Sequence, residues 1–210
     1  MPQKNDREYR NLAEVLAPSD DERLVRGYAT TFDEPYLLYS DGDYQLWEVV
    51  DRNAFDKTDV SDVIMQYDHQ GRVFARTKNG TLTLAADEHG LLIEANLGGT
   101  AIGRELYEEI KGGYTNKMSF GFTVRGDVWD RRMENGIEIS TRRITDIGKL
   151  YDVSAVSIPA NDATEISARS LADGEIARLK AERLEREKKE ALEQKRAALR
   201  NRLENTNGNL

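Results

Sequence analysis

Hydrophobic and polar residues alternate along several short segments in the first three quarters of the chain, and this period of two predicts β-strands. The clearest segment is 116–124, in which four large apolar residues alternate with Ser119, Gly121 and Thr123. Successive side chains of a strand point to opposite faces of its sheet. Ser119 is therefore predicted to lie among small residues, on the face opposite a bulky apolar row.

The same alternation, bounded by turn-forming residues, predicts the remaining strands of a mainly β domain. We expect strands at residues 24–32, 45–50, 62–68, 73–78, 81–87, 91–97, 137–147 and 150–158. A helix is predicted at 100–111, where apolar residues recur every fourth position between Thr100, a capping residue, and Gly112. A helix entry is expected at 51–55 and a polar loop at 126–136. The pattern favours an α+β fold: a β-barrel or folded sheet of mostly antiparallel strands, with helices around it.

The two ends of the chain have a different composition. Residues 1–22 are polar and charged, and we expect a loosely held arm. Residues 171–204 consist largely of Ala, Glu, Lys, Arg and Leu with no proline, which is typical of a long helix. Its leucines are too irregularly spaced to specify a coiled coil, so a solvated helix and a partner-binding or self-associating helix stay equally open. The predicted organisation is an arm at 1–22, a domain at 23–168 and a charged helical tail at 169–210.

Composition excludes several classes of function. The chain has no cysteine, which excludes a cysteine nucleophile, disulfides and thiolate metal sites, and its two histidines argue against a metal centre. The net charge is −8, and residues 1–170 carry 20 Lys/Arg against 30 Asp/Glu. Such an acidic domain argues against nucleic acid as a partner, because phosphates require a basic surface. No apolar run approaches the roughly 20 residues that a membrane-spanning helix needs. We expect no cofactor and no metal.

Three residues form a candidate catalytic set. A serine hydroxyl needs a nearby base to become a nucleophile, and that base needs a carboxylate to orient it. His69 follows the strand predicted at 62–68, so its ring can project from a strand end into a cleft. Asp152 lies in the strand predicted at 150–158, while Asp68, directly beside His69, is the rival carboxylate. The sequence thus nominates Ser119 as nucleophile, His69 as base and Asp152 as orienting acid.

Other motifs do not lead to a different chemistry. His89 lies in the turn predicted between two strands and is interpreted as exposed and inert. The glycines at 98–103 lack the lysine and hydroxyl residue of a phosphate loop and the spacing of a dinucleotide-binding loop, so capping of the next helix explains them better. Ser119 is not flanked by the Gly-x-Ser-x-Gly elbow of an esterase.

Several segments together resemble one known family. The most specific are Asp68-His69 followed by Gly71-Arg72, Met118-Ser119-Phe120-Gly121-Phe122, and Leu150-Tyr151-Asp152-Val153-Ser154. Residues 26–32, 51–55 and 90–95 add further matches in the expected order. These motifs are similar to those of the prohead (capsid maturation) proteases of HK97-type tailed phages. The resemblance spans residues 23–166 and departs at Asp152, where the family usually has glutamate.

The resemblance implies a fold similar to herpesvirus assemblins, a β-barrel surrounded by helices. It implies a serine endopeptidase that acts in the bacterial cytoplasm, inside the assembling procapsid. Its expected substrates are the scaffold or the scaffold-like segment of the major capsid protein, and the protease itself. Self-association is expected, and the tail at 169–210 is expected to resemble scaffold and to be removable. Residue by residue, the resemblance makes Ser119 the nucleophile and His69 the base, with Asp152 in the place of the glutamate.

Two alternatives stay open. A non-catalytic capsid assembly or scaffold module would keep the fold and act through its charged tail. A serine hydrolase of another type, such as an esterase, would keep the nucleophile but cleave a different bond. The intact set of serine, histidine and aspartate favours the protease.

Overall fold

A computed structural model of the protein describes residues 7–15, 17–18, 23–156, 177–178 and 180–197. The chain divides into two compact units: Pro2–Leu171, and Met1 together with Ala172–Leu210. In the second unit the described residues, 177–178 and 180–197, are helical. Arg183 is paired with Glu187 one turn later, at 3.0 Å, as is usual on a solvated helix face. The rest of the predicted tail, and residues 1–6 of the predicted arm, lie outside the described residues.

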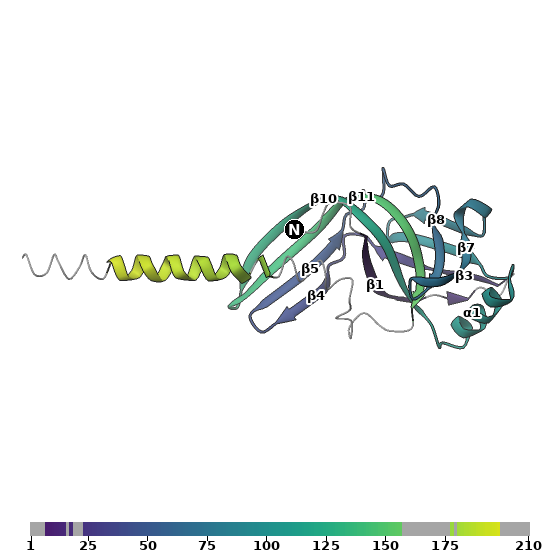
Figure 1. Ribbon diagram of the computed structural model, residues 1–210, viewed down its shortest axis with the longest axis horizontal. Helices are drawn as coiled ribbons and strands as arrows, with labels where there is room; N and C mark the ends of the chain where they lie inside the picture. The colour runs from purple at the N-terminus through teal and green to yellow at the C-terminus, as the bar shows by residue number, and fades with distance from the viewer. Residues whose placement is uncertain (1–6, 16, 19–22, 157–176, 179, 198–210) are drawn as a thin grey trace, which may run out of the picture. The chain divides into compact units, whose positions relative to one another are not determined.

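The larger unit is mainly β, as predicted, with strands that form two sheets (Figure 1). The first sheet has the strand order β1-β10-β11-β5-β4, and β6 and β7 extend it from β11. Its strands are β1 Glu8–Val15, β4 Tyr36–Asp41, β5 Tyr44–Val50, β6 Ile64–Tyr67, β7 Gln70–Arg76, β10 Lys117–Glu134 and β11 Ile137–Val156. The second sheet, in the order β2-β3-β9-β8, consists of β2 Ala17–Pro18, β3 Leu24–Thr31, β9 Gly90–Asn96 and β8 Leu82–Ala86.

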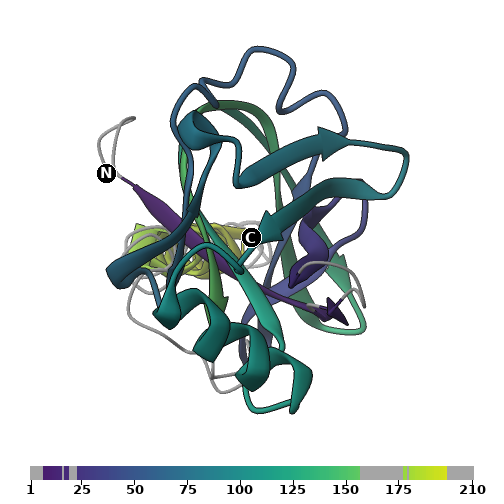
Figure 2. The ribbon, with the colours of Figure 1, turned by 90° about the vertical axis from the view of Figure 1, so that its right-hand side faces the viewer.

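The two sheets surround one hydrophobic core, with the helix α1 Ala101–Lys111 on the outside (Figure 2). Phe120 and Met65 of the first sheet, Ile93 of the second and Leu106 of α1 all belong to this core. The helix begins at the predicted cap, where the Thr100 hydroxyl accepts from the Gly103 N–H at 3.0 Å. Burial of its apolar stripe fixes α1 against the domain, just before the strand that carries Ser119.

The predicted closed barrel is not formed by the described strands. No ladder of hydrogen bonds joins the two sheets among the described residues, which therefore form a folded pair of sheets. Most pairs of the described strands are antiparallel, as predicted, and the exceptions lie on β11, which pairs in parallel with β5 along residues 138–144 and with β6 along residues 152–155. A single 20-residue strand thus organises the sheet: β10 lies along one edge, and two shorter strands share the other.

Three local predictions were wrong. Residues 126–136 are not a loop, because β10 continues to Glu134 and forms a hairpin with β11 through Asn135 and Gly136, both at positive φ. Residues 51–55 are turns rather than a helix entry, and the Asp51 carboxylate accepts from the Asn53 N–H at 3.0 Å. The strand predicted at 73–78 ends at Arg76, and a short 3-10 helix, Thr77–Asn79, follows it.

The expectation of a loose arm at 1–22 was also wrong where the structure describes it. Residues Glu8–Val15 form β1, which pairs antiparallel with β10. Its polar composition hides this because Glu8 and Arg10, only 4% and 2% exposed, are buried as partners of other charges. β4 was not predicted either.

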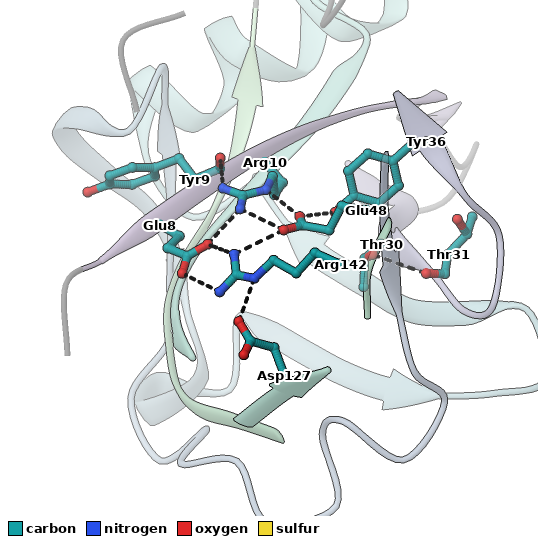
Figure 3. Close-up of polar contacts among 9 residues, drawn as sticks. All are labelled: Glu8, Tyr9, Arg10, Thr30, Thr31, Tyr36, Glu48, Asp127 and Arg142. Carbon is teal, nitrogen blue, oxygen red and sulfur yellow. Dashed lines mark hydrogen bonds and ion pairs between the residues drawn. The ribbon is translucent and has the colours of Figure 1, made fainter. Parts of the chain in front are cut away.

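A buried ion cluster holds β1 in the first sheet (Figure 3). Arg10 donates to Glu8 at 2.6 Å and, through two nitrogens, to both carboxylate oxygens of Glu48 on β5. Arg142 on β11 donates to Glu8 at 2.7 Å and to Glu48 at 3.1 Å. The two arginines and two glutamates balance in charge, and Tyr36 on β4 donates a further bond to Glu48 at 2.6 Å.

The pKa values of the cluster follow from this pairing. Burial alone would raise the pKa of Glu48, but the guanidinium groups of Arg10 and Arg142 outweigh it and hold that pKa below its usual value. Burial likewise opposes the charge of Arg10, yet Glu48 and Glu8 raise its pKa above the ordinary range. Glu48, Arg10 and Arg142 are therefore ionised at neutral pH. Breaking one pair would leave an uncompensated charge inside the domain.

Candidate active site

Ser119 lies on β10 in the alternation that the sequence predicts. Phe120 and Phe122 point into the core, where their rings stack with centroids 4.5 Å apart. Ser119 pairs in register with Ser154 of β11, and Gly121 pairs with Asp152, so these four residues share the opposite face. Ser119 is fully buried. The apolar row thus anchors the strand while the hydroxyl is presented on its other face.

His69 occupies a tight turn between β6 and β7. Tyr67 pairs with Gln70 across the two-residue loop Asp68-His69. Both loop residues have positive φ, 46° for Asp68 and 58° for His69, as a type I′ hairpin turn requires. Residues other than glycine adopt this conformation at some energetic cost, which the surroundings must offset. The Asp68 N–H supplies one restraint by donating to the Ala155 carbonyl of β11 at 3.0 Å.

The structure brings the three nominated residues together from three separate elements. The Nε2 atom of His69 is hydrogen-bonded to the Ser119 hydroxyl, and its Nδ1 atom is hydrogen-bonded to Oδ1 of Asp152. Asp152, not the rival Asp68, makes this contact at Nδ1, from inside β11 where it is 1% exposed. With Nδ1–H donating to the carboxylate, Nε2 is left to accept the serine proton. The arrangement is thus suited to general-base activation of a hydroxyl.

Ser154 adds a fourth polar group to this line. Its hydroxyl donates to Asp152 Oδ1 at 3.0 Å and lies 3.2 Å from His69 Nδ1. The Ser154 hydroxyl and the His69 imidazole are therefore hydrogen-bonded to the same carboxylate oxygen of Asp152. The second oxygen, Oδ2 of Asp152, is buried without a hydrogen-bond partner, and the guanidinium of Arg7 lies 3.9 Å from it.

Tyr9 of β1 and Arg7, which directly precedes this strand, border the site, and sequence reasoning missed both. The ring of Tyr9 packs against the imidazole of His69, with centroids 4.4 Å apart and a tilt of 60°. Arg7 lies over the ring of Tyr151 at 3.8 Å and donates to the Tyr9 hydroxyl at 3.3 Å. No local signal marks these residues, because they belong to a polar segment that becomes a strand only through distant partners.

A groove of about 420 Å³ lies next to the hairpin that carries His69. Tyr67 and Gln70, the residues on either side of the turn, form part of one wall, and α1 forms the other. Its apolar lining residues are buried or partly buried and its charged ones are exposed; the lining consists of Tyr67, Gln70, Gly71, Arg72, Phe74, Ile102, Glu105, Leu106 and Glu109. The groove is large enough to hold a side chain of an extended peptide.

Other parts of the described chain offer no second chemistry. Among the described residues, no group of three or more His, Asp or Glu side chains is placed to hold a metal ion. His89 lies in the turn before β9, where its ring meets the edge of Tyr28 at 4.5 Å, away from Ser119. None of the described helices is both long enough and apolar enough to cross a membrane.

Comparison with known proteins gives one match. A family model described as caudovirus prohead serine protease matches residues 11–176, a segment that includes Ser119, His69 and Asp152. Searches of curated proteins and of solved structures returned no significant match.

Proposed function

The chain belongs to the caudovirus prohead serine proteases, and we propose that it is the endopeptidase of capsid maturation, with Ser119 as nucleophile, His69 as general base and Asp152 as the orienting carboxylate. The observation that carries this proposal is the unbroken hydrogen-bonded line from Ser119 through His69 to Asp152. The three residues come from elements far apart in the sequence: β10, the turn between β6 and β7, and β11. The nucleophile lies on β10, the strand that carries the Met118-Ser119-Phe120 motif. The mainly β scaffold and the absence of a closed barrel among the described strands leave the proposal unaffected.

The proposed reaction follows from this geometry. Ser119 Oγ attacks the carbonyl carbon of the scissile peptide bond while its proton passes to His69 Nε2. Asp152 holds the imidazole in the tautomer that can accept this proton, and its negative charge stabilises the imidazolium that forms. The imidazolium then gives the proton to the leaving amine as the C–N bond breaks. Water, deprotonated by the same imidazole, hydrolyses the acyl-enzyme and restores Ser119.

Family membership supplies the proposed setting. The substrates would be the scaffold or the scaffold-like segment of the major capsid protein, together with the protease itself, inside the procapsid in the host cytoplasm. The charged helical segment at 180–197 would raise the local concentration of enzyme at its substrate by association with scaffold or with other copies of the chain. The tail beyond residue 169 would then be cut away.

A serine-directed fluorophosphonate tests the proposed chemistry directly. The purified chain is incubated with the probe, and peptide mapping locates the adduct; one adduct is expected, on Ser119. The purified major capsid protein of the same phage is then added to probe-treated and untreated enzyme, and cleavage is expected only with the untreated sample. An adduct on another residue, no adduct, or cleavage that persists after complete labelling would contradict the proposal.

We further propose that the groove beside the His69 hairpin receives a side chain of the substrate. Its wall includes the residues that flank His69, so a chain lying in it would pass beside the catalytic line. Ile102 of α1 lines the groove and is only partly buried, so it has surface left to cover.

Substitution of this groove residue is expected to weaken substrate binding. Ile102→Gln should raise KM for capsid-protein cleavage about tenfold, because the loss of an apolar contact of roughly 1.4 kcal/mol corresponds to that factor. The maximal rate should stay close to that of the wild type, because the catalytic line is untouched. Val128→Gln is the matched control, since Val128 is 55% exposed and lies on β10 outside the groove. Equal KM values for the two variants would remove the groove from the proposed substrate path.

A further inference from the structure

Strand β1 presents different chemistry on its two faces. Glu8 and Arg10 pair in register with Phe122 and Phe120, and they enter the buried ion cluster on that face. Tyr9 pairs in register with Gly121, and its ring lies against His69 on the other face. One short strand therefore connects the ion cluster to the candidate catalytic line.

The contact between Tyr9 and His69 depends on the absence of a side chain at Gly121. A Cβ atom built on Gly121 would come within 2.7 Å of Tyr9 Cε1 and would overlap Oδ2 of Asp152. Both groups thus occupy the space that any other residue would fill. The glycine is needed here for close approach rather than for a special backbone angle.

The hairpin that carries His69 restrains it through only a short stretch of backbone. The turn has two residues, both in the left-handed region, and the Asp68 N–H donates to the Ala155 carbonyl of β11. The ring must nevertheless keep Nε2 at the Ser119 hydroxyl and Nδ1 at Asp152 through proton transfer. Tyr9 adds a packing contact on the ring to these hydrogen bonds.

We propose that Tyr9 is a positioning residue that holds the His69 imidazole on the Ser119–Asp152 line, and that the ion cluster on the opposite face of β1 fixes the register that places it there. This inference rests on the proposed function. Arg10 and Glu8 are bound to Glu48 of β5 and Arg142 of β11, so β1 cannot shift along β10 without breaking buried ion pairs.

Three substitutions separate positioning from simple packing. Tyr9→Leu and Tyr9→Ala remove the ring, and each should lower the maximal rate of Ser119 labelling by a fluorophosphonate about tenfold, since an aromatic contact of this kind is worth about one power of ten in rate. The probe concentration that gives half of the maximal rate should change less than about twofold. Tyr9→Phe keeps the ring and should label like the wild type.

A second Tyr–His pair in the protein provides the matched control. Tyr28 contacts His89 with ring centroids 4.5 Å apart, outside the catalytic line. Tyr28→Leu should leave the labelling rate unchanged. Melting temperatures of all variants are measured alongside, so that the folded fraction of each sample is known.

Each outcome decides between defined alternatives. Wild-type labelling rates in folded Tyr9→Leu and Tyr9→Ala would overturn the inference and leave the proposed function intact. The same follows if Tyr9→Phe is as slow as Tyr9→Ala, or if both Leu and Ala variants fail to fold, which would show a structural role. A wild-type chain that is neither labelled nor able to cleave capsid protein would instead overturn the proposed function.

Discussion

Ser119→Ala is expected to lower kcat for capsid-protein cleavage roughly 10⁶-fold, and His69→Ala about as much, because nucleophile and base act as one unit. Without the hydroxyl no acyl-enzyme forms. Without the imidazole, no other side chain among the described residues is hydrogen-bonded to the Ser119 hydroxyl to accept its proton. The measurement is intact mass of capsid protein after incubation with each purified variant. At this magnitude the readout is all or none.

Matched controls are available within the same chain. Ser140 is another fully buried serine on a strand, and its hydroxyl has no hydrogen-bond partner, so Ser140→Ala removes no interaction. His89 is the other histidine, and His89→Ala leaves the catalytic line untouched. Both controls should cleave capsid protein like the wild type. Cleavage by a folded Ser119→Ala variant would favour the alternative in which the chain is a non-catalytic assembly module and another protease is at work.

Glu48→Gln is expected to destabilise the larger unit by about 3–5 kcal/mol, because it removes one of the two buried carboxylates that Arg10 and Arg142 both contact and leaves positive charge in excess inside the domain. Urea unfolding followed by circular dichroism measures this as a fall in the midpoint concentration. Glu94→Gln makes the same chemical change in an exposed pair, where Arg26 is 59% exposed, and should cost less than about 1 kcal/mol. Comparable losses in the two variants would show that burial of the cluster contributes nothing.

The same comparison has a defined pH dependence. The pKa of Glu48 in the folded protein lies below its ordinary value of 4.5, since the pull of Arg10 and Arg142 outweighs burial. A lowered folded-state pKa gives stabilisation that is complete above the unfolded pKa and is lost as pH falls through the folded value. The difference in stability between wild type and Glu48→Gln should therefore be full at pH 7 and shrink below about pH 4. A difference that stays constant at low pH would contradict the charged state assigned to Glu48.

The candidate site could be assembled from sequence because its parts follow local patterns. Alternation placed Ser119 opposite Phe120 and Phe122, and the helix before it was recognisable from Thr100 and its apolar stripe. Asp152 was nominated from its place in the strand predicted at 150–158, with Asp68 as the rival, and the family motif supported the same choice. The hydrogen bonds that join Ser119 and Asp152 to His69 depend on tertiary structure, which the sequence alone does not show.

The missed elements depend on distant partners. Glu8 and Arg10 have the composition of a solvated arm, and what buries them is Glu48 and Arg142, which lie on other strands. No short segment of the sequence contains both Glu8 or Arg10 and the distant residues that bury them. The hairpin at Asn135-Gly136 is a different case, since Asn-Gly between two strands is a strong local signal, and the charged residues around it obscured the pattern.

The complete burial of Ser119 has a kinetic consequence. A hydroxyl with no exposed surface is reached by a peptide bond only in those molecules whose covering atoms have moved aside. The observed rate is then the intrinsic rate multiplied by the open fraction, so an open fraction of about one in a hundred would slow acylation about a hundredfold. Any binding partner that stabilises the open form would accelerate cleavage without altering the geometry of Ser119, His69 and Asp152. The open fraction would thus set the rate of cleavage, and the molecules bound around Ser119 would set the open fraction.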